Sequence, residues 1–300
     1  MYDVIIIGSG PAGLSAAIYG NRAKLDVLVI EKAPFSGGQI VNTYEVDNYP
    51  GLHGIGGFDL ADKFRSHADA MGMKSVTQNV VSVDFSGDVK KVATTEQIYE
   101  GRTVLIATGA SHRKLNAAGE DEFSGKGVSY CATCDGAFFR EKDVAVVGGG
   151  DVALEDALFL ARGCGKVYLV HRRDEFRGAK ILQEAVEKTA NIEICRDTVV
   201  EEIKGEEQVS ELLIFNKKTE EHRTIAVGGI FIAVGLHPNT ELFKGKVGMD
   251  EGGYIIAGED CITDCAGVFA AGDVRTKRLR QVITAAADGA NAITSIERML

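Results

Sequence analysis

The sequence has little of several features that mark whole classes of protein. It contains only 4 prolines in 300 residues, and 45% of the residues are hydrophobic, which describes a globular chain rather than a low-complexity one. Six cysteines are too few for a secreted scaffold held by disulfides. The start Met1-Tyr2-Asp3 lacks the basic segment of a signal peptide. These deficits together predict a cytoplasmic globular protein.

An excess of positive charge is also missing. The formal net charge is -10, which argues against nucleic acid or an anionic membrane as a partner. Residues 4–21 carry no charged side chain and approach the length of a membrane span. However, Gly8, Gly10, Pro11 and Gly13 divide this stretch, so we expect a strand, a turn and a helix rather than a membrane segment.

The N-terminal stretch has the pattern of a dinucleotide-binding βαβ unit. The β-branched run Val4–Ile7 predicts a buried parallel strand, and the glycine-rich run Gly8–Gly13 follows it directly. A helical pattern comes next, and then a second apolar strand, Val27–Ile30, which ends in Glu31. Glycines let the backbone approach a pyrophosphate, and the acid accepts a hydrogen bond from a ribose hydroxyl. A bound dinucleotide is therefore expected here.

A second unit of the same kind begins at the strand Val144–Val147. The turn Gly148–Ala153 and a helix to Ala161 follow, and the next strand is Val167–Val170. Its end carries cations instead of an acid, and these fit the 2′-phosphate of an NADP-type nucleotide. The alternative is a solvated basic surface turn. The cations are His171, Arg172, Arg173 and Arg177.

A CxxC motif with a carboxylate directly behind it, Cys131–Asp135, lies between the two units. Thiols at this spacing can close a small disulfide ring and attack another disulfide, and Asp135 could transfer protons. The alternatives are a structural disulfide or half of a zinc site. The other close pair, Cys261 and Cys265, is more than a hundred residues away, so no metal site is expected.

The remaining segments carry weaker signals. Residues 37–51 predict a long functional loop, and Phe58–Met71 has helical spacing, with Leu60, Phe64 and Met71 as expected core residues. Cys164 and Cys195 are interpreted as small core residues.

The C-terminal part reads as a strand ending in a Gly-Asp turn at Asp273, followed by a helix over Gln281–Ile296. A short basic cluster lies between them. It allows two interpretations, a site for phosphate or a partner protein, or a solvated loop. Its members are Arg275, Lys277, Arg278 and Arg280.

These motifs together resemble those of the low-molecular-weight thioredoxin reductases over essentially the whole chain. A CxxC placed just before the second nucleotide motif is specific to that group. The segments that carry the resemblance are Gly8–Gly13, Gly37–Gln39, Asp47–Gly51, Ala107–Gly109, Cys131–Asp135, Gly148–Ala153, His171–Arg177, Gly235–Thr240 and Gly267–Asp273.

The resemblance implies an α/β protein with two Rossmann-like, three-layer nucleotide-binding domains. A discontinuous FAD domain would comprise residues 1–113 and 241–300, and an NADPH domain with the CxxC would comprise residues 114–240. FAD is expected at Gly8, Ser9, Gly10, Pro11, Ala12, Gly13, Glu31, Gly38, Gln39, Thr43, Asn48, Asp273 and Gln281. NADPH is expected at Gly149, Gly150, Asp151, His171, Arg172, Arg173 and Arg177.

The implied activity is NADPH-dependent reduction of the disulfide of thioredoxin or a thioredoxin-like protein. By resemblance, Cys134 lies nearer the flavin, Cys131 exchanges with the protein substrate, and Asp135 acts as acid and base. The CxxC is close in sequence to the second nucleotide motif, so one domain would present both NADPH and the dithiol to the flavin in turn by rotating. The resemblance also implies a homodimer.

Other functions use a similar fold. A related flavin disulfide reductase takes electrons from ferredoxin or another donor, but the intact second motif and its arginines argue against that reading. Ferredoxin–NADP reductase of the same fold lacks the CxxC. A non-enzymatic flavin-binding redox sensor would not need an electron path. The chain departs from the group's usual pattern at Val152, at Ala287, and at His112, where proline is common at the first domain crossing.

Overall fold

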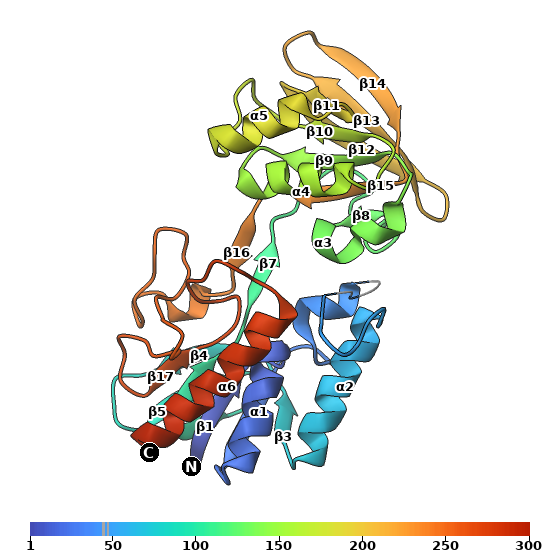
Figure 1. Cartoon of the computed structure of the whole chain (residues 1–300). Helices are drawn as coiled ribbons and strands as arrows, with labels where there is room; N and C mark the ends of the chain where they lie inside the picture. Colours follow the sequence, from blue (N-terminus) through green and yellow to red (C-terminus); the bar gives the residue numbers. More distant parts are fainter. Residues whose placement is uncertain (44–45, 47) are drawn as a thin grey trace. The chain divides into compact units, whose positions relative to one another are not determined.

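The computed structural model describes residues 1–43, 46 and 48–300. The chain divides into two compact units, each with its own core (Figure 1). The first unit comprises residues 1–41, 55–111 and 237–300, and the second comprises residues 42–54 and 112–236. The first unit is therefore discontinuous in sequence.

The first unit is built on a seven-stranded sheet. Strands β3, β2, β1, β6 and β17 pair in parallel, and β5 and β4 continue from β6 as antiparallel neighbours. The elements are β1 (Tyr2–Ile7), α1 (Pro11–Arg22), β2 (Val27–Glu31), η1 (Gly38–Asn42), α2 (Gly57–Ala70), β3 (Lys74–Thr77), β4 (Val80–Asp84), β5 (Lys90–Thr94), β6 (Ile98–Ile106), η3 (Glu241–Phe243), β17 (Val268–Ala270) and α6 (Val282–Met299).

Alternation along β1 explains why its sequence is continuously apolar. Val4 and Ile6 belong to the core cluster that includes residues of α1 and α6, whereas Ile5 and Ile7 belong to a separate cluster with residues of β4 and β5. Successive strand residues point to opposite faces of a sheet, so both faces of this strand are buried. The unit accordingly has the expected layered α/β arrangement.

Helices α1 and α6 pack closely on one another. Pro11 occupies the first turn of α1, where no intrahelical N–H donor is needed. A Cβ atom on Gly289 of α6 would lie 2.2 Å from the carbonyl oxygen of Ala12, and the Ser15 hydroxyl donates to the carbonyl of Ala286 at 2.7 Å. This contact fixes α6 against the helix that follows the first glycine-rich turn.

The second unit contains a five-stranded parallel sheet in the order β11-β10-β9-β15-β8 and a three-stranded antiparallel sheet, β12-β13-β14. Its elements are β8 (Val128–Ser129), α3 (Ala132–Asp135), η2 (Gly136–Phe139), β9 (Val144–Gly148), α4 (Asp151–Ala161), β10 (Val167–Val170), α5 (Lys180–Lys188), β11 (Ile192–Cys195), β12 (Thr198–Gly205), β13 (Val209–Asn216), β14 (Glu221–Ala226) and β15 (Gly229–Ala233).

Two short strands, β7 (Ala110–His112) and β16 (Leu236–Pro238), lie where the chain passes between the units, and they pair with each other. The amide of Asn239 donates to the carbonyl of Gly109 at 3.0 Å, and that of Arg113 donates to the carbonyl of Gly235 at 3.0 Å. The two passages are therefore held side by side.

The core predictions are confirmed for Leu60, Cys164 and Cys195, all of which are buried. The prediction for Met71 is wrong, because this side chain is 40% exposed. It caps the C-terminus of α2, where the helical pattern no longer determines which way a side chain faces. Phe64 is half-buried.

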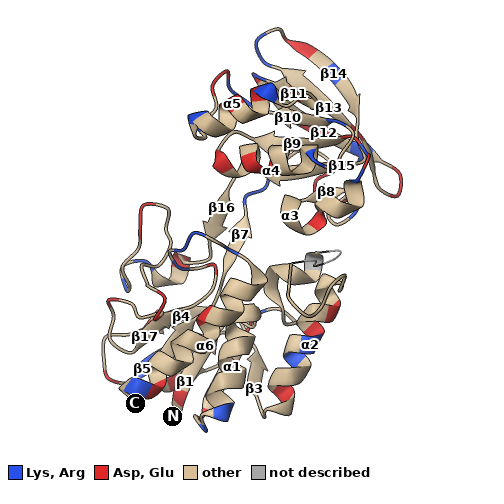
Figure 2. Cartoon of the chain, viewed as in Figure 1, with Lys and Arg blue, Asp and Glu red and all other residues tan. Residues whose placement is uncertain are grey.

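The surface carries charges of both signs, and acidic and basic side chains are interspersed along α2 (Figure 2). Within the described part of the chain, no helix is long and apolar enough to cross a membrane. The same residues contain no cluster of histidine, cysteine or acidic side chains suited to a metal ion.

Candidate active site and nucleotide sites

The first glycine-rich turn is shaped for close approach by a ligand. A Cβ on Gly8, whose φ is +107°, would lie 2.5 Å from the carbonyl oxygen of Ala107, and one on Gly13 would lie 2.0 Å from the carbonyl oxygen of Gly8. By contrast, no atom lies within 4 Å of a Cβ built on Gly10. Gly10 also caps α1 without any side-chain hydrogen bond. The open N-terminus of α1 therefore fits a pyrophosphate.

Glu31, at the end of β2, holds this turn. Its Oε2 accepts hydrogen bonds from the amide and the hydroxyl of Ser9, at 2.8 and 2.9 Å, and its Oε1 accepts one from the amide of Ala33 at 2.9 Å. Each carboxylate oxygen has more than one lone pair, so a ribose hydroxyl could still donate to Glu31.

Asp273 belongs to the Gly-Asp turn that follows β17. Its Oδ1 is buried and has no hydrogen-bond partner in the described structure. Burial raises the pKa of this carboxyl, although Lys277 and Arg280 act in the opposite direction. A buried oxygen without a donor is costly. A hydroxyl of a bound flavin cofactor would supply the donor.

The structure also shows where several other residues lie that the sequence predicted for the flavin site. A Cβ on Gly38 would lie 3.5 Å from the Cα of Gly10, so the structure brings this residue to the glycine-rich turn. The Gln39 amide donates to the carbonyl of Ala110, and Gln281 is the N-cap residue of α6. Pro11 and Ala12 are the first two residues of α1.

Thr43 and Asn48 lie in the segment that precedes α2 (Gly57–Ala70). Both belong to residues 42–54, which are grouped with the second unit, whereas the turn lies in the first. Asp47, which contributes to the family pattern, lies outside the described residues.

The second glycine-rich turn repeats the open geometry of the first. No atom lies within 4 Å of a Cβ on Gly150, which caps α4 without a side-chain hydrogen bond. Gly149 passes directly over the His171 ring, since a Cβ there would lie 2.2 Å from it. The Asp151 carboxylate accepts a hydrogen bond from the amide of Ala179 at 2.7 Å, which ties the turn to the loop after β10.

The cations after β10 divide into two kinds. Arg172, Arg173 and Arg177 are exposed, and none forms an ion pair with another described residue. His171 is buried, its Nε2 lies 3.0 Å from the carbonyl oxygen of Glu175, and burial lowers its pKa. Three free guanidinium groups thus remain for a phosphate, whereas a neutral His171 supports the loop from beneath.

The cysteine pair forms a disulfide in this structure. Cys131 and Cys134 are joined, with their Cα atoms 5.3 Å apart, and Cys131 is the N-cap residue of the short helix α3. The Cys131 sulfur lies 3.4 Å from the Thr133 hydroxyl. The pair can therefore cycle between disulfide and dithiol within one turn of chain.

Asp135 lies in the same turn and has the properties of a proton carrier. Burial raises the pKa of its carboxyl, while a hydrogen bond from Ser129 lowers it. Its Oδ1 is buried without a partner in the part of the chain that the structure describes. A carboxyl with a raised pKa can hold or release a proton nearer neutral pH.

Ser129 is a site residue that the sequence motifs did not reveal. Its hydroxyl donates to Oδ2 of Asp135 at 2.6 Å and accepts from the amide of Cys131 at 3.1 Å. The available signal was a serine two residues before the CxxC at the end of a strand. Ser129 thus connects the Asp135 carboxylate to the backbone amide of Cys131.

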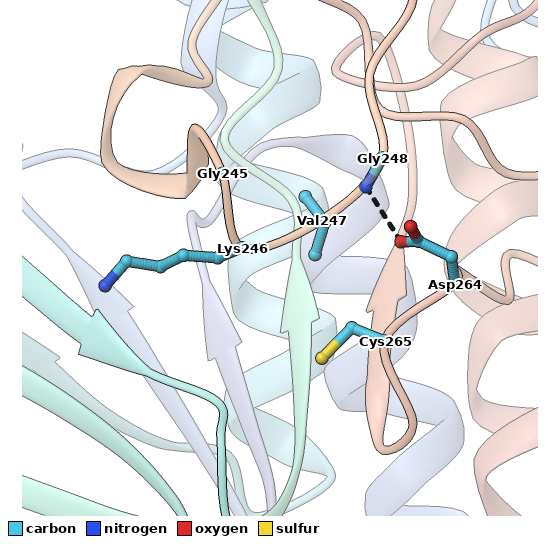
Figure 3. A pocket seen from close by; sticks show the side chains of 6 residues that line it. All are labelled: Gly245, Lys246, Val247, Gly248, Asp264 and Cys265. Carbon is cyan, nitrogen blue, oxygen red and sulfur yellow. Dashed lines mark hydrogen bonds between the residues drawn. The ribbon is translucent and has the colours of Figure 1, made fainter.

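A separate hollow in the first unit has a volume of about 390 Å³ (Figure 3). It contains none of the predicted site residues. The ammonium of Lys246 donates to the carbonyl of Val83, and Asp264 accepts from the amide of Gly248 at 2.8 Å. Its charged groups are thus already paired within the fold. The lining residues are Gly245, Lys246, Val247, Gly248, Asp264 and Cys265.

Comparisons with known proteins identify the family of this chain. Residues 2–289 match the family model described as pyridine nucleotide-disulphide oxidoreductase. A thioredoxin reductase of Streptomyces clavuligerus is 46% identical over 301 residues, covering 99% of this chain and 94% of that protein. A bifunctional thioredoxin reductase/thioredoxin of Mycobacterium leprae is 45% identical and is matched over 66% of its own length by the whole of this chain.

Solved structures give the same result. Thioredoxin reductase from Streptococcus pyogenes has a TM-score of 0.93 at 44% identity, covering 100% of this chain and 98% of that one. A ferredoxin-flavin thioredoxin reductase from Clostridium acetobutylicum has a TM-score of 0.54 at 31% identity, covering 99% and 98%. The chain belongs to the pyridine nucleotide-disulphide oxidoreductase family, within its group of low-molecular-weight thioredoxin reductases.

Proposed function

We propose that this chain catalyses the NADPH-dependent reduction of the disulfide of thioredoxin or a thioredoxin-like protein. The observation that carries the proposal is the Cys131–Cys134 disulfide beside Asp135, in the unit that also carries three exposed arginines after β10. The Mycobacterium leprae relative, whose name joins a reductase to thioredoxin, supports thioredoxin as the partner.

FAD and NADPH are the cofactors of this family, and we assign each to one unit. FAD would bind residues 1–113 and 241–300, at the open turn around Gly10 and at Asp273. NADPH would bind residues 114–240, at Gly150 and the three arginines. A flavin held at these residues would supply two-electron chemistry between a hydride donor and a disulfide.

The reaction with the partner uses the chain's own thiols. The Cys131 thiolate attacks the partner's disulfide, forms a mixed disulfide and releases one partner thiolate. The Cys134 thiolate then attacks Cys131, which restores the Cys131–Cys134 disulfide and releases the second partner thiolate. Two electrons leave the dithiol in this exchange, and Asp135 transfers protons as thiol and thiolate interconvert.

The dithiol and the NADPH site lie in one unit, so we infer that the units rotate about the two passages β7 and β16 to present each in turn to the flavin. We also propose a homodimer and a cytoplasmic location, which rest on the family and on the composition.

The electron donor and the partner can be tested together. NADPH should bleach the flavin absorbance of the holoenzyme, and adding oxidised thioredoxin should then start continuous NADPH oxidation. Glutaredoxin-like and peroxiredoxin-linked disulfide proteins are the comparison substrates. Bleaching by reduced ferredoxin but not by NADPH would contradict the proposal and favour the alternative donor.

A further inference from the structure

Two members of the basic cluster after β17, Arg275 and Lys277, are neither solvated nor open to a phosphate. Arg275 and Lys277 have side chains that are only 7% exposed, and both pair with one carboxylate, that of Asp288 on α6. Asp288 is itself only 4% exposed. A buried carboxylate is tolerated only when its oxygens are paired. Arg275 and Lys277 supply these partners, so they form a buried ion-pair network with Asp288.

The Asp288 carboxylate accepts four hydrogen bonds from a single loop. Its Oδ2 accepts from the amide of Gly272, from Nε of Arg275 and from Nζ of Lys277, each at 2.9 Å, and its Oδ1 accepts from Nη2 of Arg275 at 2.7 Å. Burial alone would raise the pKa of Asp288, but the bonds from Arg275 and Lys277 outweigh it and lower the pKa. The Asp288 carboxylate is therefore ionised, and it binds both Gly272 at the start of the loop and Lys277 at its end.

Asp273 lies between those donors. Gly272 precedes it, and Arg275 and Lys277 follow it, whereas the buried Oδ1 of Asp273 has no partner of its own in the described structure. Its place therefore depends on the loop and not on bonds made by its own side chain. A Cβ on Gly272 would lie 3.0 Å from the Cβ of Ala12, so the loop also rests on the first glycine-rich turn.

We propose that Asp288 is a positioning residue of the flavin site, which fixes the Gly272–Lys277 loop so that Asp273 presents its unpartnered oxygen to bound FAD. The inference rests on the proposed placement of FAD in the first unit. The close contact of Gly289 with Ala12 shows that α6 is fixed against α1. Asp288 of α6 therefore connects the Gly272–Lys277 loop to the helix that follows the first glycine-rich turn.

The test is a double-substitution cycle on the holoenzyme, with FAD release measured by flavin fluorescence and the bound flavin followed by absorption. We expect Asp273→Asn and Asp288→Asn each to raise the dissociation constant of FAD by about tenfold. If Asp288 acts through Asp273, the double variant should be little worse than either single variant.

Thr263→Val is the matched control. The Thr263 hydroxyl is buried and donates to the carbonyl of Val268 at 2.7 Å, so its loss should lower the melting temperature and leave FAD affinity unchanged. Lys277→Met serves as the second variant if Asp288→Asn does not fold. It keeps the Asp288–Arg275 pair, and it should show the same non-additivity with Asp273→Asn at smaller size.

Two results would overturn the inference in different ways. Strictly additive losses, or an Asp288→Asn variant that melts earlier but binds FAD normally, would reduce Asp288 to a structural role. An Asp273→Asn variant with unchanged FAD affinity would instead show that the flavin site itself is misplaced.

Discussion

At the scale of single residues, the proposed proton transfer at the dithiol involves the hydroxyl of Ser129, which belongs to none of the sequence motifs. Ser129 bonds both to the Asp135 carboxylate and to the amide of Cys131. Its hydrogen bond lowers the pKa of Asp135 against the larger effect of burial. The serine therefore sets how readily the carboxyl next to the dithiol releases its proton.

Replacing Ser129 with alanine should raise the pKa of Asp135 further, because the stabilising donor to the ionised form is lost. The limb of the pH–rate profile that reports Asp135 should then move to higher pH in steady-state thioredoxin reduction. Ser210→Ala, a serine in β13 of the same unit, is the control. A profile identical to that of the parent would remove Ser129 from the proton path.

His112 is the last residue of β7, at one passage between the units. Its ring stacks on Tyr130, with centroids 4.9 Å apart, and the Tyr130 hydroxyl donates to Glu120 at 2.6 Å. Burial lowers the pKa of His112 to about 4. The neutral ring is thus part of a packed contact next to the dithiol.

Acidification should weaken this contact. The folded pKa lies below the ordinary value of 6.5, so the stabilisation is present above pH 6.5 and is lost as the pH falls toward 4. The loss should amount to about 1–3 kcal/mol, since each pKa unit corresponds to about 1.4 kcal/mol. His112→Phe keeps the stacking and should lose less stability between pH 7 and pH 4.5 in urea unfolding.

The exposed His67 provides the comparison, because His67→Phe should leave the acid sensitivity of the parent unchanged. Equal acid sensitivity of His112→Phe and the parent would show that His112 titrates normally.

At the scale of elements, the strand–turn–helix units were predictable and their internal contacts were not. Periodicity and glycine spacing are local signals, and they placed β1, β9 and β10 within a residue or two. Met71 was misread because helical spacing gives no warning of where a helix ends.

The fate of a charged side chain depends on partners distant in sequence, which explains the less predictable part of the site. The sequence allowed either a site for phosphate or a partner protein or a solvated loop at Arg275 and Lys277, because the local pattern does not show that both pair with Asp288 of the next helix. The sequence pattern groups His171 with its arginine neighbours, and it does not show that the His171 ring packs against Gly149. Tertiary packing, and not the local pattern, decides each of these cases.

The arginine loop after β10 should select the nucleotide. Arg172→Ala combined with Arg173→Ala removes two charge-assisted donors to a 2′-phosphate and should raise the KM for NADPH on the order of 100-fold. The KM for NADH should change little. Lys217→Ala with Lys218→Ala, two adjacent exposed cations in the same unit, is the control. An unchanged preference for NADPH would refute the role of the loop.

At the scale of the whole molecule, the proposed electron path uses sites in both compact units. The fold class and the family followed from the order of motifs along the chain. The pairing of β7 with β16 did not, since three-residue strands carry too little pattern to be recognised. These paired passages are two of the places where the chain passes between the units, and we expect them to guide the inferred rotation.

The most direct test of the electron path uses Cys131→Ser in the holoenzyme. We expect that NADPH still bleaches the flavin, because this substitution leaves the proposed nucleotide and flavin sites unchanged. Thioredoxin-dependent NADPH oxidation should fall to the rate seen without thioredoxin. If the variant reduced thioredoxin at the parent rate, the Cys131–Cys134 pair would not be the route by which electrons leave this protein.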